Sequence, residues 1–452
     1  MSSDISSIFK AYDIRGRVGS ELTSDVAQRV GAALAEWLPN EGPVAVGRDM
    51  RLDSADLAAA LIEGLRLQGR EVRDIGEVTS DMIYFTVGKF GLAGGAMITA
   101  SHNPGKDNGI KMCREEARPI GIESGLAEIR DTVLAEAIAP TRNEGALLQK
   151  DVKSDWVQHV LQFVDATSWP KMRLAIDAGN GMAGAIIPVL QEFLPSVEII
   201  PMYFELDGTF PNHIANPLIP ENLVDLQKKV QSEKLDLGIA FDGDGDRAVL
   251  IDETGQPLSG TTMTAILAAY FLEKQPGATV LYNAICGRAA KETIQAHGGK
   301  AIRTKVGHSF IKADMREHDA IFAGEHSGHY YFKDNFCADS GLIAAVVALQ
   351  VYAEKGKKLS ELAREFRTYA TIPETNFEVV DKTAILQRIA GEFKDGEQDT
   401  LDGLTVNYPD YWFNLRASNT EPVMRLNAEA KTKEQLATLV AKVKKMIAEP
   451  ES

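Results

Sequence analysis

The chain has 452 residues, of which 44% are hydrophobic and 25% charged, and its formal net charge at pH 7 is −16. This length exceeds what one hydrophobic core supports, so we expect roughly three or four domains of ~100–150 residues each. The negative charge argues against non-specific binding to nucleic acid or to an anionic membrane, since both need a basic surface.

The remaining composition predicts a cytoplasmic protein. Cys113, Cys286 and Cys337 are an odd number of cysteines without metal-ligand spacing, as expected in a reducing compartment. The N-terminal residues lack the apolar stretch of a secretory signal. The most apolar later run, residues 342–353, is shorter than the ~20 residues that span a bilayer, so we expect no membrane partner.

Most of the chain alternates helices with short strands, which is typical of βαβ units. The first unit is predicted to contain a helix over 54–68 and strands over 72–75 and 96–99. The second, after a polar stretch at 142–153, contains strands 173–177, 197–201 and 235–241 and helices 185–193 and 221–232. The third contains strands 279–283 and 301–305 and helices 288–297, 309–317 and 340–354.

The C-terminal part has a different order of elements. Strands are predicted near 377–380, 404–407, 412–415 and 424–429, with helices over 383–393 and 433–448. We therefore predict an α/β fold of three related mixed α/β domains and a C-terminal α+β domain. The expected domains are residues 1–150, 151–253, 254–367 and 368–452.

A candidate nucleophile follows the strand at 96–99. Ser101 lies in a turn marked by Asn103 and Pro104, which places its hydroxyl at the end of a strand, where α/β enzymes keep their sites. A free serine hydroxyl attacks poorly, so a neighbouring base or cation is needed, and His102 or a bound metal could supply it. The alternative is a plain turn with a capping serine.

Three carboxylates form a candidate metal site. Asp242, Asp244 and Asp246 alternate with glycines that let the backbone curl until all three face one cation. Hard oxygen ligands favour Mg²⁺ over zinc. A calcium EF-hand fits poorly, because Arg247 stands where that loop needs glycine; a solvated acidic turn is the other alternative. Arg247 either pairs with these carboxylates or holds a substrate phosphate.

Residues 324–329 are predicted to form a polar strand-to-strand turn. Glu325 and Ser327 offer the acceptors and the donor that recognise sugar hydroxyls. His308 and His329 titrate near neutrality and are candidates for proton transfer. A surface hairpin without function is the alternative.

Candidate phosphate ligands gather near the C-terminal strands. A guanidinium beside small donors is what a phosphate clamp requires, and here the alternative is a simple turn. The candidates are Arg416, Ser418, Asn419 and Thr420, with Lys10, Arg15 and Lys111 as further cations and Tyr12 as an anchor. Residues 178–181 lack phosphate-loop spacing and predict a tight turn.

In this order, the runs at 99–104, 242–247, 324–329 and 416–422 resemble the α-D-phosphohexomutase family, especially its bacterial phosphomannomutase and phosphoglucomutase members. The resemblance covers nearly the whole chain. It implies four domains around a central cleft, with one loop from each facing it, and one Mg²⁺ held by Asp242, Asp244 and Asp246 against Ser101. It also implies a monomer or weak homodimer.

The implied activity is that of an intramolecular phosphotransferase, an isomerase that interconverts mannose 6-phosphate and mannose 1-phosphate. Ser101 would pass a phosphoryl group to the sugar phosphate, and the resulting 1,6-bisphosphate would turn over and return its other phosphate. A hexose 1,6-bisphosphate is thus also the expected activator. The candidate catalytic residues are Ser101, His102, Arg15, Lys111, Arg247, His308 and His329, and the candidate substrate ligands are Tyr12, Lys305, Glu325, Ser327, Arg416, Ser418, Asn419 and Thr420.

Two positions bear on which sugar is used. His326 stands where bifunctional members have methionine, and Ile285 stands where they have lysine, which favours mannose. A phosphoglucomutase or a bifunctional enzyme is the nearest alternative, because mannose and glucose differ only at C2. A non-catalytic sugar-phosphate binding protein and a metal-dependent phosphatase are more distant alternatives.

Overall fold

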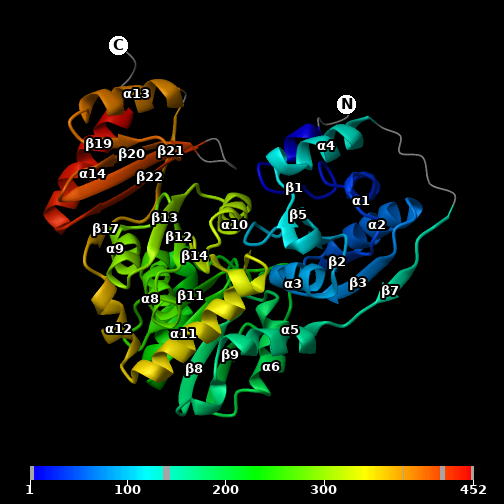
Figure 1. The fold of residues 1–452 in the computed structure, drawn as a ribbon, viewed down its shortest axis with the longest axis horizontal. Helices are drawn as coiled ribbons and strands as arrows, with labels where there is room; N and C mark the ends of the chain where they lie inside the picture. Colours follow the sequence, from blue (N-terminus) through cyan, green and yellow to red (C-terminus); the bar gives the residue numbers. More distant parts are fainter. Residues whose placement is uncertain (1–4, 136–142, 380, 418–422, 449–452) are drawn as a thin grey trace.

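The computed structural model describes residues 5–135, 143–379, 381–417 and 423–448, which form four sheets in chain order (Figure 1). We call the units built on these sheets domains I to IV. The predicted boundaries after residues 150, 253 and 367 fall between elements of successive sheets. Domain II lies between domains I and III, and domain IV sits against domain III (Figure 1).

Domains I to III repeat one topology. Each has a central pair of parallel strands, a third parallel strand on one side, and an antiparallel strand that follows the pair. In domain I the order is β3 (Val72–Glu77), β2 (Val44–Arg48), β4 (Gly94–Ile98) and β5 (Asp107–Arg114). The same order is β9 (Val197–Met202), β8 (Met172–Asp177), β10 (Leu237–Phe241) and β11 (Ala248–Asp252) in domain II, and β13 (Lys300–Thr304), β12 (Thr279–Asn283), β14 (Phe322–Gly324) and β15 (Tyr330–Phe332) in domain III.

The crossover helices also repeat, as parallel strands require. They are α2 (Ser54–Leu67) and α3 (Ser80–Phe90), α6 (Ala183–Gln191) and α7 (Val224–Glu233), and α9 (Arg288–Ala296) and α10 (His308–Glu317). The predicted helix over 221–232 is in fact a 3₁₀ turn, Pro220–Leu223, followed by α7. Lys234, in the left-handed conformation, ends α7 before β10 begins at Leu237.

Three predicted site runs occupy the same topological position. The β4–β5, β10–β11 and β14–β15 connections contain Ser101, the three aspartates and Glu325, respectively. Each joins the last parallel strand to its antiparallel neighbour, so all three leave corresponding edges of their sheets. The repetition in element order predicted from the sequence is therefore a repetition of topology.

Domain IV contains an antiparallel sheet covered by α13 (Lys382–Glu392) and α14 (Lys433–Ala448). Its strands are β17 (Ala370–Thr371), β18 (Thr375–Glu378), β19 (Glu397–Asp399), β20 (Leu404–Asn407), β21 (Tyr411–Ala417) and β22 (Val423–Ala430). The β21–β22 connection holds Ser418, Asn419 and Thr420, which lie outside the described residues. The predicted strand over 377–380 is shifted to Thr375–Glu378, where it pairs with β22.

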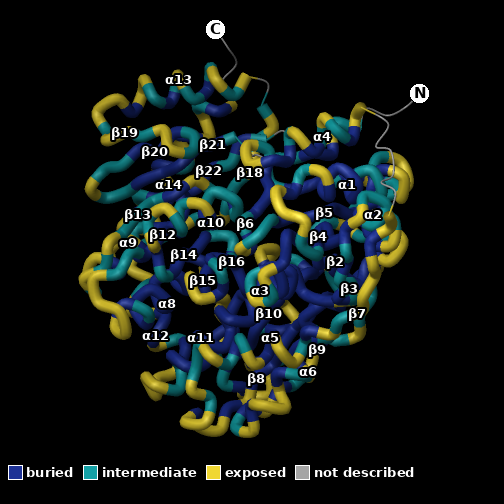
Figure 2. Tube along the Cα trace, turned by 45° about the vertical axis from the view of Figure 1, so that its right-hand side comes forward, coloured by how far each residue is buried: buried dark blue, intermediate teal, exposed yellow. Residues whose placement is uncertain are grey.

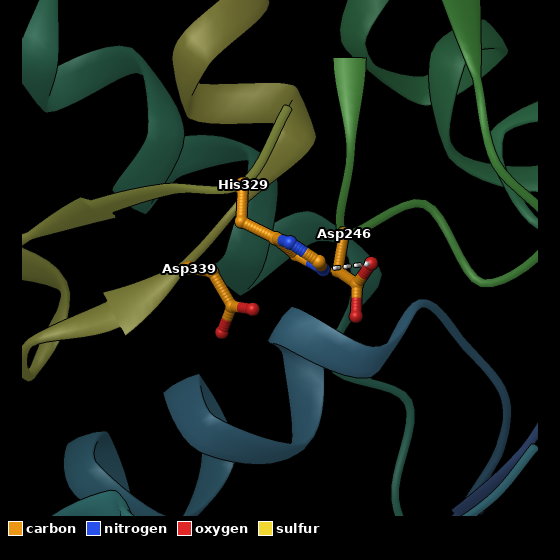
Figure 3. Close-up of side chains that lie close together, drawn as sticks. All are labelled: Asp246, His329 and Asp339. Carbon is orange, nitrogen blue, oxygen red and sulfur yellow. Dashed lines mark ion pairs between the residues drawn. The ribbon is translucent and has the colours of Figure 1, made fainter. Parts of the chain in front are cut away.

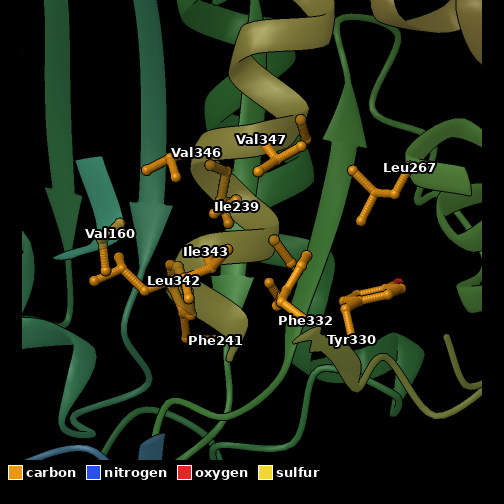
Figure 4. Packing of buried hydrophobic residues seen from close by; sticks show 14 of the residues in the cluster. Val160, Ile239, Phe241, Leu267, Tyr330, Phe332, Leu342, Ile343, Val346 and Val347 are labelled. Atoms are coloured by element: carbon orange, nitrogen blue, oxygen red, sulfur yellow. The ribbon is translucent and has the colours of Figure 1, made fainter. Parts of the chain in front are cut away.

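One hydrophobic cluster joins domains I to III. Figure 4 shows α11 (Gly341–Lys355) packing Leu342, Ile343 and Val346 near Ile239 and Phe241 of β10. Domain IV has a separate core around Phe413, Leu415 and Leu426. In Figure 2 buried segments run through domains I, II and III, in agreement with this shared cluster. Among the described residues, no helix combines the length and apolar character needed to cross a membrane.

Candidate active site

Ser101 adopts a strained backbone conformation that aims its hydroxyl at domain II. Its φ of 52° is in the left-handed region, which is unfavourable for a residue with a side chain. The Ser101 amide donates to Thr99 Oγ1 at 2.9 Å. The Ser101 hydroxyl donates to Asp242 Oδ2 at 2.8 Å. The turns of domains I and II therefore meet at the predicted nucleophile and the first predicted metal ligand.

Arg51, which was not predicted from the sequence as a site residue, fixes the turn that contains Ser101. Its buried guanidinium donates to four main-chain carbonyls. The acceptors are Ser101 at 2.8 Å, Asn103 at 2.7 Å, and Pro104 and Asp107 at 2.9 Å each. Asp49 pairs with Arg51 at 3.2 Å, and Phe210 of domain II packs on its guanidinium. A side chain that acts through carbonyls leaves no motif, although its place just after β2 is a position where functional residues gather.

Lys111 neutralises two of the three aspartates. Its ammonium lies 2.7 Å from Asp244 Oδ2 and 2.6 Å from Asp246 Oδ2. Ser80, also missed from the sequence, donates to Asp244 Oδ2 at 2.5 Å. Although burial opposes it, the charge of Lys111, with that of Arg247, holds the pKa of Asp246 well below its ordinary range.

The aspartates fit a hard divalent cation. Ligand atoms from all three lie within 4.8 Å of one another. Asp244 Oδ1 and Asp246 Oδ1 are buried and find no hydrogen-bond partner among the described residues. Burial, and then the charges of Asp246 and Asp244, raise the pKa of Asp242 well above its ordinary range. Carboxylate oxygens without hydrogen-bond partners and a concentration of negative charge beside Ser101 are the features that a Mg²⁺ site requires.

Arg247 links the turns of all three domains. Its Nη2 donates to His102 Nδ1 at 2.9 Å, and its Nε donates to His329 Nε2 at 3.1 Å. The Arg247 Nε also lies 3.4 Å from Asp242 Oδ2. His102 Nδ1 has one lone pair, and with Arg247 using it, the Ser101 proton is directed to Asp242. Burial, with Arg247 and Arg15, lowers the pKa of His102 well below its usual value, so this imidazole is neutral.

The domain III turn holds Glu325 in a fixed orientation. Asn283 Nδ2 donates to Glu325 Oε2 at 3.1 Å, and Tyr331 donates to Oε1. Ser327 Oγ lies 2.9 Å from His329 Nδ1. Because Arg247 donates to Nε2 of His329, we assign the imidazole proton of His329 to Nδ1, which donates it to Ser327 Oγ. Asn283 and Tyr331 are additions that the sequence did not indicate.

The remaining predicted residues of domains I and III line the same region. Arg15 donates to Asp13 Oδ2 at 2.8 Å and to the Ala100 carbonyl at 2.9 Å. Tyr12 donates to the Val306 carbonyl at 2.9 Å, and its ring contacts His308. Burial, with Lys312 and Lys111, lowers the pKa of His308 well below its usual value. Lys305 is exposed, beside the ring of Phe310.

A second acidic cluster lies behind the metal site. Figure 3 shows His329 between Asp246 and Asp339, with its ring 3.5 Å from Asp246 Oδ1. Lys312, fully buried, places its ammonium 2.7 Å from Asp339 and over the Tyr84 ring. Because Lys312 already neutralises Asp339, we interpret this cluster as a structural charge network and not as a second metal site.

Arg416 of domain IV is the one predicted phosphate ligand of that domain within the described residues. It is buried and pairs with Glu374 at 3.1 Å. Burial, opposed by Glu374 and reinforced by Arg416, lowers the pKa of His326 in the β14–β15 turn. Arg416 and Glu374 of domain IV therefore lie near His326 of the domain III turn.

Comparison with known proteins places all four units in one group. Models of phosphoglucomutase/phosphomannomutase α/β/α domains I, II and III match residues 6–138, 154–255 and 259–369, and the model of the C-terminal domain matches residues 374–446.

Individual relatives agree over nearly full length. Phosphohexose mutases of Xanthomonas campestris are 41% identical over 94% of this chain and 95% of their own. A phosphomannomutase of Salmonella montevideo is 39% identical over 94% of each chain. The crystal structure of a phosphoglucomutase/phosphomannomutase family protein from Burkholderia thailandensis is 33% identical, with a TM-score of 0.90 over 98% of this chain and 97% of that one.

Proposed function

This chain belongs to the phosphoglucomutase/phosphomannomutase family, and from that premise we propose that it interconverts mannose 6-phosphate and mannose 1-phosphate through a phosphoserine at Ser101. The observation that carries the proposal is the 2.8 Å contact between Ser101 and Asp242, from turns of two different domains. A binding protein needs no serine hydroxyl beside a cluster of carboxylates.

The proposed reaction transfers one phosphoryl group from Ser101 to the sugar phosphate and then another from the sugar back to Ser101. The bond between phosphorus and Ser101 Oγ breaks as a bond forms to O1 or O6 of the sugar phosphate, and the sugar hydroxyl loses its proton. In the second half the bond between the other phosphorus and its sugar oxygen breaks, this phosphoryl group returns to Ser101 Oγ, and the released sugar oxygen takes up the proton. His102, whose Nδ1 lies 3.1 Å from Ser101 Oγ, and His329 on the domain III turn are the proposed holders of the transferred proton.

Cations from this chain stabilise the charge on the transferring group. Lys111, Arg15 and Arg247 lie within the Ser101 region, and Arg247 reaches a phosphate there by exchanging its contact with His102. Asp242, Asp244 and Asp246 are the residues that would hold Mg²⁺, which when bound supplies further positive charge to the phosphoryl oxygens.

The domain III turn supports sugar recognition. Glu325 is fixed by Asn283 and Tyr331, so its carboxylate is preorganised to accept hydrogen bonds from adjacent sugar hydroxyls. Ser418, Asn419 and Thr420 are proposed, with Arg416, to bind the phosphate that is not reacting. We also propose a monomer or weak homodimer in the cytoplasm; Cys113, Cys286 and Cys337 are buried and unpaired, which fits a reducing compartment.

Initial rates test the proposal. Mannose 1-phosphate, glucose 1-phosphate and glucosamine 1-phosphate are compared with Mg²⁺ and a trace of hexose 1,6-bisphosphate, and 6-phosphates and free phosphate are measured together. We expect a mannose preference of tenfold or more, ~1.4 kcal/mol in the barrier. Near-equal rates with mannose and glucose would show a bifunctional enzyme, and phosphate release alone would show a phosphatase.

A further inference from the structure

Strands β21 and β22 place two guanidinium groups opposite each other. Arg416 and Arg425 are direct cross-strand partners in the antiparallel register. Like charges in that position destabilise a sheet. Because Arg416 is only 3% exposed, water screens the repulsion poorly. An anion between the two guanidinium groups offsets this repulsion.

Glu374, between β17 and β18, supplies that anion. Its Oε2 lies 3.1 Å from Arg416 Nη2, and its Oε1 lies 3.2 Å from Arg425 Nη1. Asn427 Nδ2 donates to Oε2 at 2.9 Å. Although burial opposes it, Arg416, Asn427 and Arg425 hold the pKa of Glu374 below its ordinary range, so this carboxylate is ionised. One carboxylate thus bridges both arginines.

The bridge leaves polar atoms unused. Arg416 Nε and His326 Nδ1 are both buried and find no hydrogen-bond partner among the described residues. Arg416 belongs to β21 of domain IV, and His326 belongs to the β14–β15 turn of domain III. A carboxylate has two oxygens to offer, whereas a phosphate monoester has three terminal oxygens and more charge. Phosphate therefore satisfies this cluster better than Glu374 does.

We propose that Glu374 is a positioning residue of the phosphate clamp: it holds Arg416 and Arg425 in place in the free enzyme, and the non-reacting phosphate of the substrate replaces it on both guanidinium groups. This inference rests on the proposed function, which supplies the phosphate.

The exchange has a use in a reaction whose intermediate must turn over. The bisphosphate has to release one phosphate from the clamp before presenting the other to Ser101. Glu374 re-pairs with the arginines at that moment, so release does not leave the buried Arg416 facing Arg425 without a bridging carboxylate.

Replacing Glu374 by glutamine tests whether its negative charge competes with phosphate for the two arginines. E374Q keeps an oxygen acceptor for Asn427 but loses the charge that competes with phosphate. The matched control is E378Q, which removes an exposed carboxylate from the neighbouring strand β18. Wild type and both variants are titrated calorimetrically with mannose 6-phosphate and, separately, inorganic phosphate. We expect E374Q to bind both probes about three- to tenfold more tightly, and E378Q to match the wild type.

Kinetics supply a second readout. E374Q is expected to lower KM and kcat together, because a phosphate held more tightly is released more slowly. A purely structural role predicts the opposite change in KM. The double variant R416A/E374Q should lose the tighter binding expected of E374Q, which would show that Arg416 is responsible for it.

The possible results are distinct. Phosphate binding by folded E374Q that is unchanged or weaker overturns the inference and leaves the mutase activity standing. Tighter binding without turnover of any hexose phosphate supports the inference and overturns the proposed function. If neither probe binds to the wild type or to E374Q, the clamp is not a phosphate site and the inference is wrong.

Discussion

The predicted phosphoryl-transfer centre and the predicted phosphate clamp are built in different ways. Ser101, Asp242 and Lys111 are buried, and they belong to domains that share one hydrophobic cluster. The clamp belongs to domain IV, which has its own core and is joined to domain III by polar contacts such as those of Arg288 with the Pro409 and Tyr411 carbonyls. Hydrophobic packing holds the residues of the predicted centre, whereas ion pairs with Glu374 hold the arginines of the proposed clamp.

The largest effect expected at the centre is that of Ser101→Ala. Removing the hydroxyl removes the only atom that carries the phosphoryl group in the proposed reaction, so kcat should fall by about 10³-fold or more. Binding of mannose 6-phosphate should change little, because the clamp is untouched. Full turnover with bisphosphate supplied would contradict the phosphoserine mechanism and remove the distinction between the two regions.

Lys111→Met should lower both stability and rate. Removing Lys111 leaves Asp244 and Asp246 buried without their cation, which costs about 3–5 kcal/mol when nothing replaces it. Mg²⁺ bound by the aspartates would offset part of this loss. We therefore expect the melting temperature of this variant to rise more with added Mg²⁺ than that of the wild type. Equal Mg²⁺ responses would show that the aspartates do not bind the ion, and exposed Lys106→Met is the control.

Arg416→Lys should act mainly on binding. Lysine keeps the charge but loses the fork that contacts two oxygens at once, so KM for mannose 1-phosphate should rise about tenfold while kcat stays within about threefold. A variant that instead lost kcat with unchanged KM would place Arg416 in the chemical step and would break the comparison. Steady-state kinetics at saturating Mg²⁺ decide between the two results.

A pH dependence of stability is expected from the contact between domains I and III. Burial raises the pKa of Asp81 to about 7, and Ser340 of domain III donates to it at 2.6 Å. Its folded pKa lies above the ordinary value near 4, so the folded state holds the proton longer and stability falls as pH rises from about 4 to 7. The slope is at most ~1.4 kcal/mol per pH unit.

Asp81→Asn should flatten this dependence, because asparagine does not titrate. Melting temperatures measured from pH 5 to 8 check the prediction, with exposed Asp56→Asn as the control. Equal slopes for Asp81→Asn and the wild type would show that Asp81 is already ionised at pH 5.

The sequence predicts the parts of the fold and site that depend on local pattern. Apolar periodicity places β12 at the predicted residues and α2 within one residue. The turns with Ser101, Asp242 and Glu325 are recognisable because each places polar residues and glycine directly after an apolar strand. Packing rarely requires polar side chains directly after a buried strand, so their presence at these positions points to a function.

Residues that act through distant partners are not predictable in this way. Arg51 binds carbonyls about 50 residues away, and Glu374 meets Arg416 42 residues later. Asn283 and Tyr331 look like ordinary strand residues until the sheet brings them to Glu325. Their roles depend on tertiary contacts, which no short sequence motif predicts.

The threefold repetition of topology has a consequence for how such a protein changes over time. A scaffold that occurs three times presents three equivalent turns, and each carries different predicted site residues: a nucleophile, metal ligands or sugar ligands. Because each turn leaves its sheet at the same place, its residues can be replaced without altering the strand order. Duplication followed by divergence of single turns is thus a route by which one simple unit yields a complete catalytic apparatus.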